Sequence, residues 1–471
     1  MPLKLKYNRV DHKEGLATYF REYLRGVLTA KKPDKANYRG WQMQKYYEDS
    51  LDWENNPLFG WCEKNTKKDG TKYNLYTDGL KIYTTLDSRM QQYAEDAVTE
   101  HLKELQGYFF KEKKGAKKAP YTFRLTQEQV DEILGRAMRL SDRYRIMKKA
   151  GATEAEIKKA FDTPEEMSVF SWEGRKTPIM TPMDSIRYYK FFLRAGFMSM
   201  DPRSGHVKAY VGGPNYHYFQ YDMAMVGRRQ VGSTIKPFLY TLAMENGFSP
   251  CDEVRHVEYT LIDENGKPWT PRNANKKLIG DMVTVKWGLA NSDNWITAYL
   301  MSKLNPYNLK RLIHTFGVRN RDIVPSVSLC LGPCEISVGE MVSAYTAFPN
   351  KYPGSSAVRD PHRGQRRKRA GNLCSRNAGS HQRIQRLQDA GHAACRCQRR
   401  YRRPCAPSGC ESRHGRQDRN DELQCRRLVY GFTPSLVSGC WVGGEDRDIH
   451  FDTMLHGQGA SMHCLSGPNT W

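Results

Sequence analysis

Apolar residues recur at helical spacing in two stretches near the start of the chain. Residues 15–33 form the first stretch and residues 88–109 the second, and this spacing is typical of amphipathic helices. Asp87 and Ser88 stand at the start of the second stretch, where a short polar side chain caps the free N–H groups of a first turn. Residues 76–87 alternate between apolar and polar types and predict a strand. The expected inner face of the second helix comprises Met90, Tyr93, Ala94 and Ala97.

Residues 125–170 predict two or three further helices. Two of them open with a threonine that is followed three residues later by glutamine or glutamate, in "TQEQVDEIL" from residue 126 and in "TEAEIKKAF" from residue 153. In this arrangement the two side chains satisfy free backbone N–H groups reciprocally, as in a capping box. The pattern therefore indicates where each helix begins.

A β-hairpin is predicted for residues 195–215, "AGFMSMDPRSGHVKAYVGGPN". Its two apolar-rich runs flank Asp-Pro-Arg-Ser-Gly, where proline presets φ and glycine accepts a positive value. Helical stretches follow at residues 234–246, 284–304 and 308–318. Strands that lead into helices, with much of the sheet expected late in the chain, predict an α+β domain.

At 471 residues the chain is long enough for two or three domains with full cores. No run approaches the roughly 18 apolar residues that a membrane span needs. The opening "MPLKLKYNRVDHKEG" has no apolar segment behind its basic residues. We therefore expect neither a secretory signal nor a membrane anchor in this chain.

The net charge of +23 is concentrated in one segment. Residues 353–430 contain 18 arginines, Lys368 and six acidic residues, a net charge of +13, and their only aromatic residues besides histidine are Tyr401 and Tyr430. Such a composition buries too little apolar surface to order itself by packing, so we expect disorder. Six of the 12 cysteines also lie here: Cys374, Cys395, Cys397, Cys405, Cys410 and Cys425.

Candidate chemistry lies in "GRRQVGSTIKPFLYTLAMENG", residues 227–247. Ser233 and Lys236 are three residues apart, so on a helix the amine and the hydroxyl share a face. A serine hydroxyl is a weak nucleophile until a neighbouring base takes its proton, and burial at a helix start lowers the pKa of a lysine enough for that role. Alone the motif is weak, because Ser-x-x-Lys also arises by chance in a chain of this length.

A second motif, Ser292-Asp293-Asn294, lies downstream and, like the first, next to helical sequence. A hydroxyl and an amide two residues apart can present a proton relay and a substrate hydrogen bond from one loop. The ordered pair of Ser-x-x-Lys and then Ser-Asp-Asn favours serine acyl-transfer chemistry. Another Ser-x-Asn, from Ser375 to Asn377, falls in the arginine-rich segment and is expected by chance.

Four stretches together resemble the transpeptidase domain of class A, bifunctional penicillin-binding proteins. They are "RRQVGSTIKPFLYTLAMENGFSP", "LANSDNWITAYL", "LGPCEISVGEMVSAYTAF" and "GFTPSLVSGCWVGGEDRD". The resemblance covers residues 180–350 and 431–462. Residues 1–110 resemble the region that joins this family's glycosyltransferase and transpeptidase domains.

The resemblance implies a site, a fold and a reaction. Ser233 would be the acylated nucleophile, Lys236 its base, and Ser292 and Asn294 the second active-site element. The implied fold is the serine penicillin-binding and β-lactamase-like α+β domain, an antiparallel sheet flanked by helices. The implied enzyme attacks the D-Ala-D-Ala bond of peptidoglycan stem peptides, binds β-lactams, needs no cofactor or metal, and works at the periplasmic face of the inner membrane in a membrane-anchored family.

The chain departs from the family at its third motif, Lys-Thr-Gly or Lys-Ser-Gly on an edge strand, which occurs nowhere in the sequence. Its expected place, just before "GFTPSLVSG", holds "RQDRNDELQCRRLVY". We hypothesise that residues from about 354 to 430 are translated out of frame. From Arg416 onward, allowed codons read one nucleotide later give Gly-Lys-Thr-Gly-Thr-Thr.

Other interpretations of the arginine-rich segment stay open. Arginines favour phosphate contacts, as in a nucleic-acid-binding arm, but no interleaved aromatics or known module accompany them, so no nucleic acid is expected. Cysteines 395, 397, 405 and 410 with His414 lack the paired spacing of structural zinc sites. The whole chain could also be a non-catalytic remnant, or a relative that binds or hydrolyses β-lactams.

Without its third motif the chain is expected to have little cross-linking activity. The expected division of the chain has six parts. The parts are an inter-domain linker (1–80), a strand and helical insertion (81–179), the first part of the transpeptidase domain (180–353), an out-of-frame disordered segment (354–430), late strands (431–462) and an out-of-frame tail (463–471).

Overall fold

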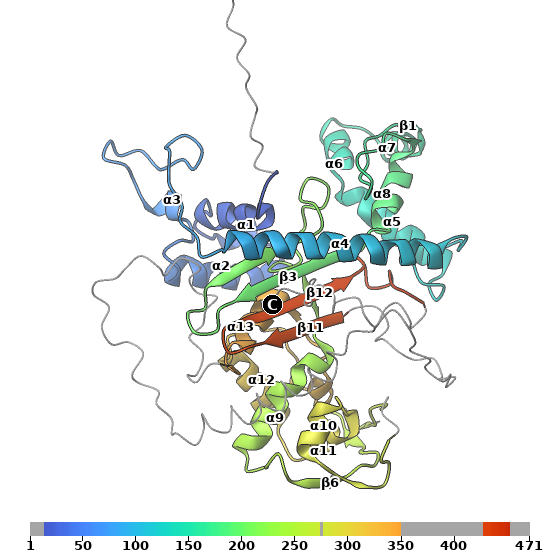
Figure 1. The fold of residues 1–471 in the computed structure, drawn as a ribbon. Helices are drawn as coiled ribbons and strands as arrows, with labels where there is room; N and C mark the ends of the chain where they lie inside the picture. Colours follow the sequence, from blue (N-terminus) through green and yellow to red (C-terminus); the bar gives the residue numbers. More distant parts are fainter. Residues whose placement is uncertain (1–13, 274–276, 350–426, 453–471) are drawn as a thin grey trace, which may run out of the picture.

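The computed structural model describes residues 14–273, 277–349 and 427–452. At its centre is an antiparallel sheet with the strand order β11, β12, β3, β4 (Figure 1). The predicted hairpin is confirmed as β3 (Arg194–Met200) and β4 (Val207–Val211), and β12 (Val437–Gly443) pairs with β3 along its whole length. The two edge strands are β4 and β11 (Arg427–Phe432), and β11 pairs with β12. Two distant parts of the chain thus share one sheet.

The two faces of this sheet bury different cores, because successive side chains of a strand point to opposite sides. On one face, Ala195 and Phe197 of β3 pack in a core with α4 (Ser88–Lys113), which lies along the sheet in Figure 1. On the other face, Met198 and Met200 belong to a core with α9 (Lys236–Glu245) and α13 (Val338–Tyr345). Helices therefore cover both faces.

A helical lobe stands at one end of α4. It contains α5 (Gln127–Leu140), α6 (Asp142–Lys149), α7 (Glu154–Asp162) and α8 (Pro182–Lys190). Both predicted capping boxes are confirmed, at the starts of α5 and α7. Asp87 caps α4 as expected, because its carboxylate accepts the backbone N–H groups of Arg89 and Met90.

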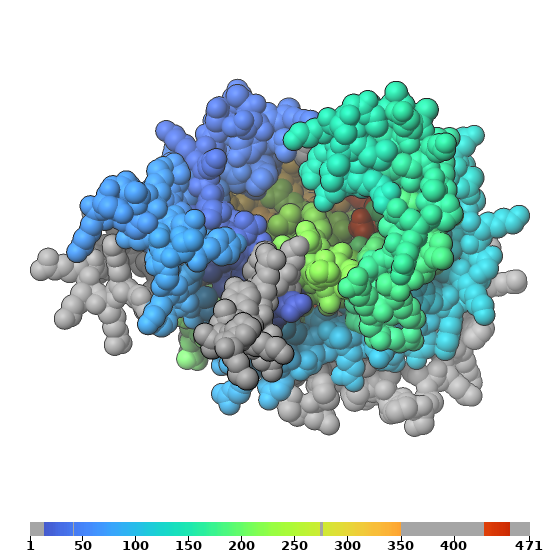
Figure 2. Space-filling model, turned by 90° about the horizontal axis from the view of Figure 1, so that it is seen from above, coloured from blue at the N-terminus to red at the C-terminus, as the bar shows by residue number. Residues whose placement is uncertain are grey.

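The N-terminal part of the described chain is also helical, with α1 (Thr18–Leu28), α2 (Met43–Asn55) and α3 (Trp61–Lys64). Figure 2 shows a hollow between these blue residues and the teal residues of the lobe, with light green residues at its floor. No helix within residues 14–273, 277–349 and 427–452 is both long and apolar enough to cross a bilayer.

The part of the chain that carries the candidate chemistry packs below the sheet in Figure 1. It contains α9, α10 (Val285–Ala290), α11 (Asn294–Ser302) and α12 (Pro306–Thr315). The remaining elements are η1 (Lys35–Asn37), η2 (Gly40–Gln42), η3 (Gly232–Ile235), η4 (Val327–Leu331) and the antiparallel pairs β1 (Glu165–Glu166) with β2 (Ile179–Met180), β5 (Arg228–Gln230) with β10 (Glu335–Ser337), β6 (Glu253–Arg255) with β9 (Met282–Thr284), and β7 (Leu261–Ile262) with β8 (Pro268–Trp269).

Three details differ from the sequence-based expectation. Residues 76–87 form no strand. Although they alternate in polarity, they form no β-ladder with another segment of the described chain, and the side chains of Ile82 and Tyr83 are exposed. Tyr93 of α4 is 52% exposed, since the buried stripe runs instead through Gln91, Ala94 and Val98. The stretch 284–304 is two helices, α10 and α11, because a turn at residues 291–293 separates them.

The boundary of the arginine-rich segment also needs a correction. Residues 427–430, which the sequence assigns to the disordered segment, form the first part of β11. Their apolar residues explain this, since Tyr430 is 1% exposed and its ring stacks on that of Tyr345 with centroids 4.8 Å apart. Residues 350–426, and the tail from residue 453, lie outside the described part of the chain.

Candidate active site

Ser233 lies on a 3-10 turn, η3, which is held in place by backbone hydrogen bonds to residues 332–334. The turn follows β5, and the ladder between β5 and β10 continues into it: the Val231 N–H donates to the carbonyl of Cys334 at 3.0 Å, and the Gly232 N–H to that of Gly332 at 2.9 Å. Gly232 itself has a φ of 54°, which favours glycine. The Ser233 side chain is exposed at the end of this clamped turn.

Lys236 begins α9 one turn after Ser233, and it is 1% exposed. Its Nζ lies 2.6 Å from the carbonyl oxygen of Ser292, 3.3 Å from the Ser292 Oγ and 2.7 Å from the Asn294 Oδ1. A buried amine needs such partners, because an unpaired polar group away from water is costly. The structure thus brings Lys236, Ser292 and Asn294 together, with Ser233 on the adjoining turn.

The loop that carries Ser292 and Asn294 is shaped by the junction of α10 and α11. Ser292 has a φ of 52°, in the left-handed region that a residue with a side chain rarely adopts. Asp293 then caps α11, because its Oδ1 accepts the N–H groups of Trp295 and Ile296, both at 3.0 Å. Asn294 is anchored further by its Nδ2, which donates to the carbonyl of Arg272 at 2.7 Å.

Sequence reasoning missed two residues that contact this loop, His256 and Asn273. The Nε2 of His256 lies 2.8 Å from the Asp293 Oδ2, and the Asn273 Nδ2 donates to the same oxygen at 2.7 Å. Both side chains of the His256–Asp293 pair are fully buried. No spacing or motif links residue 256 to residue 293, so the sequence held no signal for this pair.

Comparisons with known proteins place these residues in a family. The family model "Penicillin binding protein transpeptidase domain" matches residues 195–351, and "Penicillin-binding protein middle domain" matches residues 116–193. Penicillin-binding protein 1A of Rickettsia bellii is 27% identical over 300 residues, 60% of this chain and 37% of the relative. Penicillin-binding protein 1A of Neisseria meningitidis is 31% identical over 171 residues, 36% of this chain and 21% of the relative.

This chain carries a class A penicillin-binding protein transpeptidase region. The chain spans only 37% and 21% of the lengths of these two relatives. The structure of penicillin-binding protein 1A from Haemophilus influenzae superposes with a TM-score of 0.52 at 16% identity, over 91% of this chain and 70% of that one. The expected penicillin-binding α+β fold is confirmed.

The transpeptidase match contains all four expected site residues and ends at residue 351. It therefore includes neither the arginine-rich segment nor the hairpin of β11 and β12. The middle-domain match covers the lobe from α5 to α8, which lies largely within the expected helical insertion. Within the described residues, no cluster of histidine, cysteine and acidic side chains is arranged to hold a metal ion.

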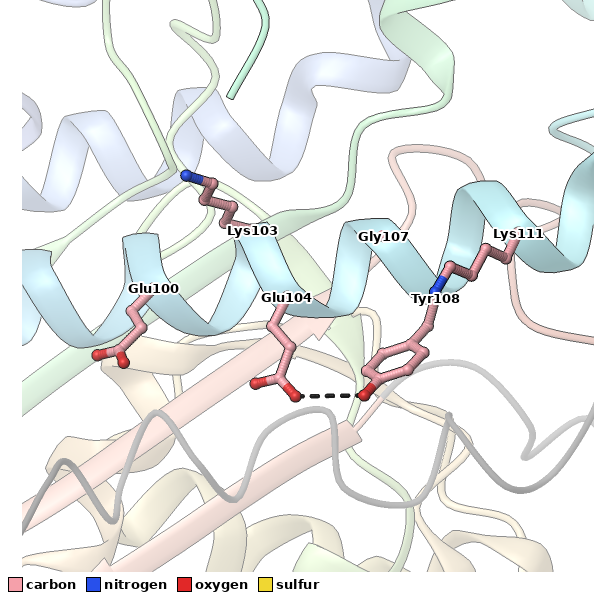
Figure 3. A pocket seen from close by; sticks show the side chains of 6 residues that line it. All are labelled: Glu100, Lys103, Glu104, Gly107, Tyr108 and Lys111. Atoms are coloured by element: carbon pink, nitrogen blue, oxygen red, sulfur yellow. Dashed lines mark hydrogen bonds between the residues drawn. The ribbon is translucent and has the colours of Figure 1, made fainter. Parts of the chain in front are cut away.

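A separate hollow of about 530 Å³ lies on α4, outside the residues that match the transpeptidase domain, and none of the candidate site residues lines it. Figure 3 shows its described lining residues, all of which lie on α4. The Tyr108 hydroxyl donates to Glu104 there at 3.5 Å, a weak bond on an exposed helix face. The lining residues are Glu100, Lys103, Glu104, Gly107, Tyr108 and Lys111.

Proposed function

We propose that this region is the acylating part of a serine D,D-transpeptidase, with Ser233 as the nucleophile and Lys236 as its base. One observation carries the proposal. The buried Lys236 amine contacts Ser292 and Asn294 one helical turn from the exposed Ser233 hydroxyl. An activated nucleophile needs such a base, held in turn by other groups.

The oxygens around Lys236 hold its amine beside the turn that bears Ser233. The Ser292 carbonyl, the Ser292 Oγ and the Asn294 Oδ1 all accept from its Nζ. In the neutral form that a base needs, the amine keeps two N–H groups and one lone pair. The Ser292 hydroxyl, at 3.3 Å the most distant of the three oxygens, can then donate to that lone pair instead of accepting.

The proposed reaction is acyl transfer on peptidoglycan stem peptides. The Ser233 Oγ attacks the carbonyl carbon of the D-Ala-D-Ala bond, and its proton passes to Lys236. The C–N bond breaks, and the terminal D-alanine leaves with that proton. An acceptor amine then attacks the ester, and Ser233 regains a proton. A β-lactam amide would acylate Ser233 in the same way, and by family resemblance the reaction takes place at the periplasmic face of the inner membrane.

The absence of Lys-Thr-Gly and Lys-Ser-Gly from the sequence limits this activity. In the family that strand lines the cleft, holds the substrate and completes the oxyanion hole. Loss of a single oxyanion donor lowers a rate by about 10²–10³. We therefore propose that the chain as encoded is acylated far more slowly than a version in which the arginine-rich segment is read in the shifted frame.

Intact-mass spectrometry with benzylpenicillin tests both parts of the proposal. The shifted-frame chain should gain one penicilloyl adduct, which maps to Ser233 and disappears in Ser233→Ala. The chain as encoded should gain it much more slowly. Stoichiometric labelling of the chain as encoded at the same rate would contradict the impairment, and an adduct on any other residue would contradict the assigned nucleophile.

A further inference from the structure

A fully buried histidine lies behind the Ser292–Asn294 loop. His256 follows β6, and its backbone is held on both sides: its N–H donates to the Asp281 carbonyl at 2.8 Å, and its carbonyl accepts the Gly280 N–H at 2.9 Å. Its imidazole lies between the rings of Trp287 on α10 and Trp295 on α11, each 5.1 Å away. The histidine thus occupies the junction of the two helices that present the loop.

Both ring nitrogens of His256 have polar partners. The Nδ1 lies 3.1 Å from the carbonyl oxygen of Leu278. The Nε2 lies 2.8 Å from the Asp293 Oδ2 and 3.1 Å from the Asn273 Nδ2. His256, Asp293 and Asn273 thus form one polar cluster behind the Ser292–Asn294 loop.

This cluster completes the hydrogen bonding of Asp293. The Oδ1 of Asp293 accepts two N–H groups at the start of α11, while its Oδ2 accepts from the Asn273 Nδ2 at 2.7 Å and pairs with the His256 Nε2 at 2.8 Å. Without His256, the Oδ2 of this fully buried carboxyl group would lose one of its two side-chain partners. An incompletely bonded buried carboxylate is strongly disfavoured, so the turn around it would open.

Ser292 depends on that turn. Its left-handed backbone, with a φ of 52°, persists only where surrounding contacts hold it. This conformation places both the carbonyl oxygen and the Oγ of Ser292 against the Lys236 Nζ. We propose that His256 is a positioning residue, which acts through Asp293 to hold Ser292 and Asn294 against Lys236. The role in acyl transfer rests on the proposed function, but the positioning itself does not.

Two amide substitutions differ in which bond they retain. His256→Gln reaches the position of Nε2 and keeps a donor for Asp293, whereas His256→Asn reaches only the position of Nδ1 and loses that contact. His217→Gln, on an exposed histidine after β4, is the matched control. Because the two test variants place the same functional group at different distances, their comparison separates the Asp293 contact from the general loss of an imidazole.

The first measurement is the acetylation rate of Lys236 in the full chain, read by peptide mass spectrometry. Lys236 is 1% exposed, so it should be protected in the unmodified chain, in His217→Gln and in His256→Gln. In His256→Asn the rate should rise about tenfold or more, because losing a hydrogen bond to a charged partner favours local opening by that factor. Lys113, which is 2% exposed on α4, should stay protected in every variant and so report that the remaining fold is intact.

Equal Lys236 protection in His256→Asn and His256→Gln overturns the positioning role. The role is also overturned if Lys113 and Lys236 both lose their protection in both His256 variants. Benzylpenicillin acylation of Ser233, followed in the same variants, separates the two proposals. If His256→Asn slows the acylation step with little change in the initial noncovalent affinity, and His256→Gln restores it, the positioning acts in acyl transfer. If the acetylation results hold but no variant is ever acylated, the positioning stands and the proposed function fails.

Discussion

Gly332→Ala perturbs the support of the nucleophile turn without touching a site side chain. Gly332 ends η4 with a φ of 71°, and its carbonyl accepts the Gly232 N–H at 2.9 Å. A Cβ added at this position would lie 2.2 Å from the Gly232 carbonyl oxygen and 2.8 Å from its nitrogen. Because these are backbone atoms, no side-chain rotation relieves the overlap, so one of the two chain segments must move.

The cost can be built from two contributions. An alanine in the left-handed conformation costs about 1–2 kcal/mol. Separating the segments breaks the Gly232 N–H bond, which contributes about another 1 kcal/mol. We therefore expect Gly332→Ala to lower the free energy of unfolding by about 2–3 kcal/mol, a large fraction of the 5–15 kcal/mol that stabilises a typical domain. Alternatively the turn shifts at a smaller cost in stability, and the Ser233 hydroxyl moves with it.

Gly266→Ala is a matched control, since Gly266 has a φ of 74° and a Cβ there meets no atom within 4 Å. It should cost only the conformational contribution of about 1–2 kcal/mol. Urea unfolding gives the two stabilities, and benzylpenicillin labelling of the shifted-frame chain gives the effect on Ser233. If Gly332→Ala matches Gly266→Ala in stability and is labelled at the unsubstituted rate, the turn at Gly232 is not supported by Gly332 and the reasoning is wrong.

Three further predictions concern single side chains. Lys236→Met should slow Ser233 acylation in the shifted-frame chain by about 10²–10⁴, as expected for loss of a general base, and intact-mass spectrometry measures this; unchanged labelling would contradict the assigned base. Burial opposes ionisation of Glu445, but the positive charges of Arg194 and Lys190 still hold its pKa below the usual value. This carboxylate should thus stabilise the fold above its unfolded pKa and lose that effect as the pH falls through its pKa in the folded chain. The melting temperatures of Glu445→Gln and of the unsubstituted chain should therefore differ near neutral pH and converge in acid. A difference in melting temperature that does not change with pH would argue against the ion pairs. Cys251 is exposed, while burial raises the pKa of Cys330 to about 12, so iodoacetamide should label the first and spare the second in peptide mapping; equal labelling would contradict the burial of Cys330.

The parts of the fold that sequence predicted well are those that local chemistry determines. The two capping boxes, the Asp87 cap and the hairpin of β3 and β4 each depend on residues within a few positions of one another. The alternation of residues 76–87 was misleading, because a strand also requires a partner with free hydrogen-bonding groups, and polarity does not reveal one.

The candidate site divides in the same way. Ser233 and Lys236 are adjacent on a turn and could be found from their spacing, and Asn294 and Ser292 entered through a motif that resembles a family. His256 could not be found from either, because its contact with Asp293 spans 37 residues and depends on how β6 and α11 pack. Burial of a histidine is decided by the whole fold, which no local pattern encodes.

One edge of the central sheet lies beside the turn that bears Ser233. β11 is the strand at that edge of the described sheet, and it contacts η3. Tyr430 of β11 stacks on Tyr345, whose hydroxyl donates to the Thr234 carbonyl on the turn that bears Ser233.

A further strand paired with the outer edge of β11 would therefore run beside Ser233, where the family's Lys-Thr-Gly strand is expected to line the cleft. In the sequence that strand should come just before Gly431, and there the chain has residues 416–430 of the arginine-rich segment. The explanation by a change of reading frame is thus specific. If the codons for residues 416–422 do not read as Gly-Lys-Thr-Gly-Thr-Thr one nucleotide later, a frameshift does not explain the missing Lys-Thr-Gly strand. The arginine-rich segment then has a different origin.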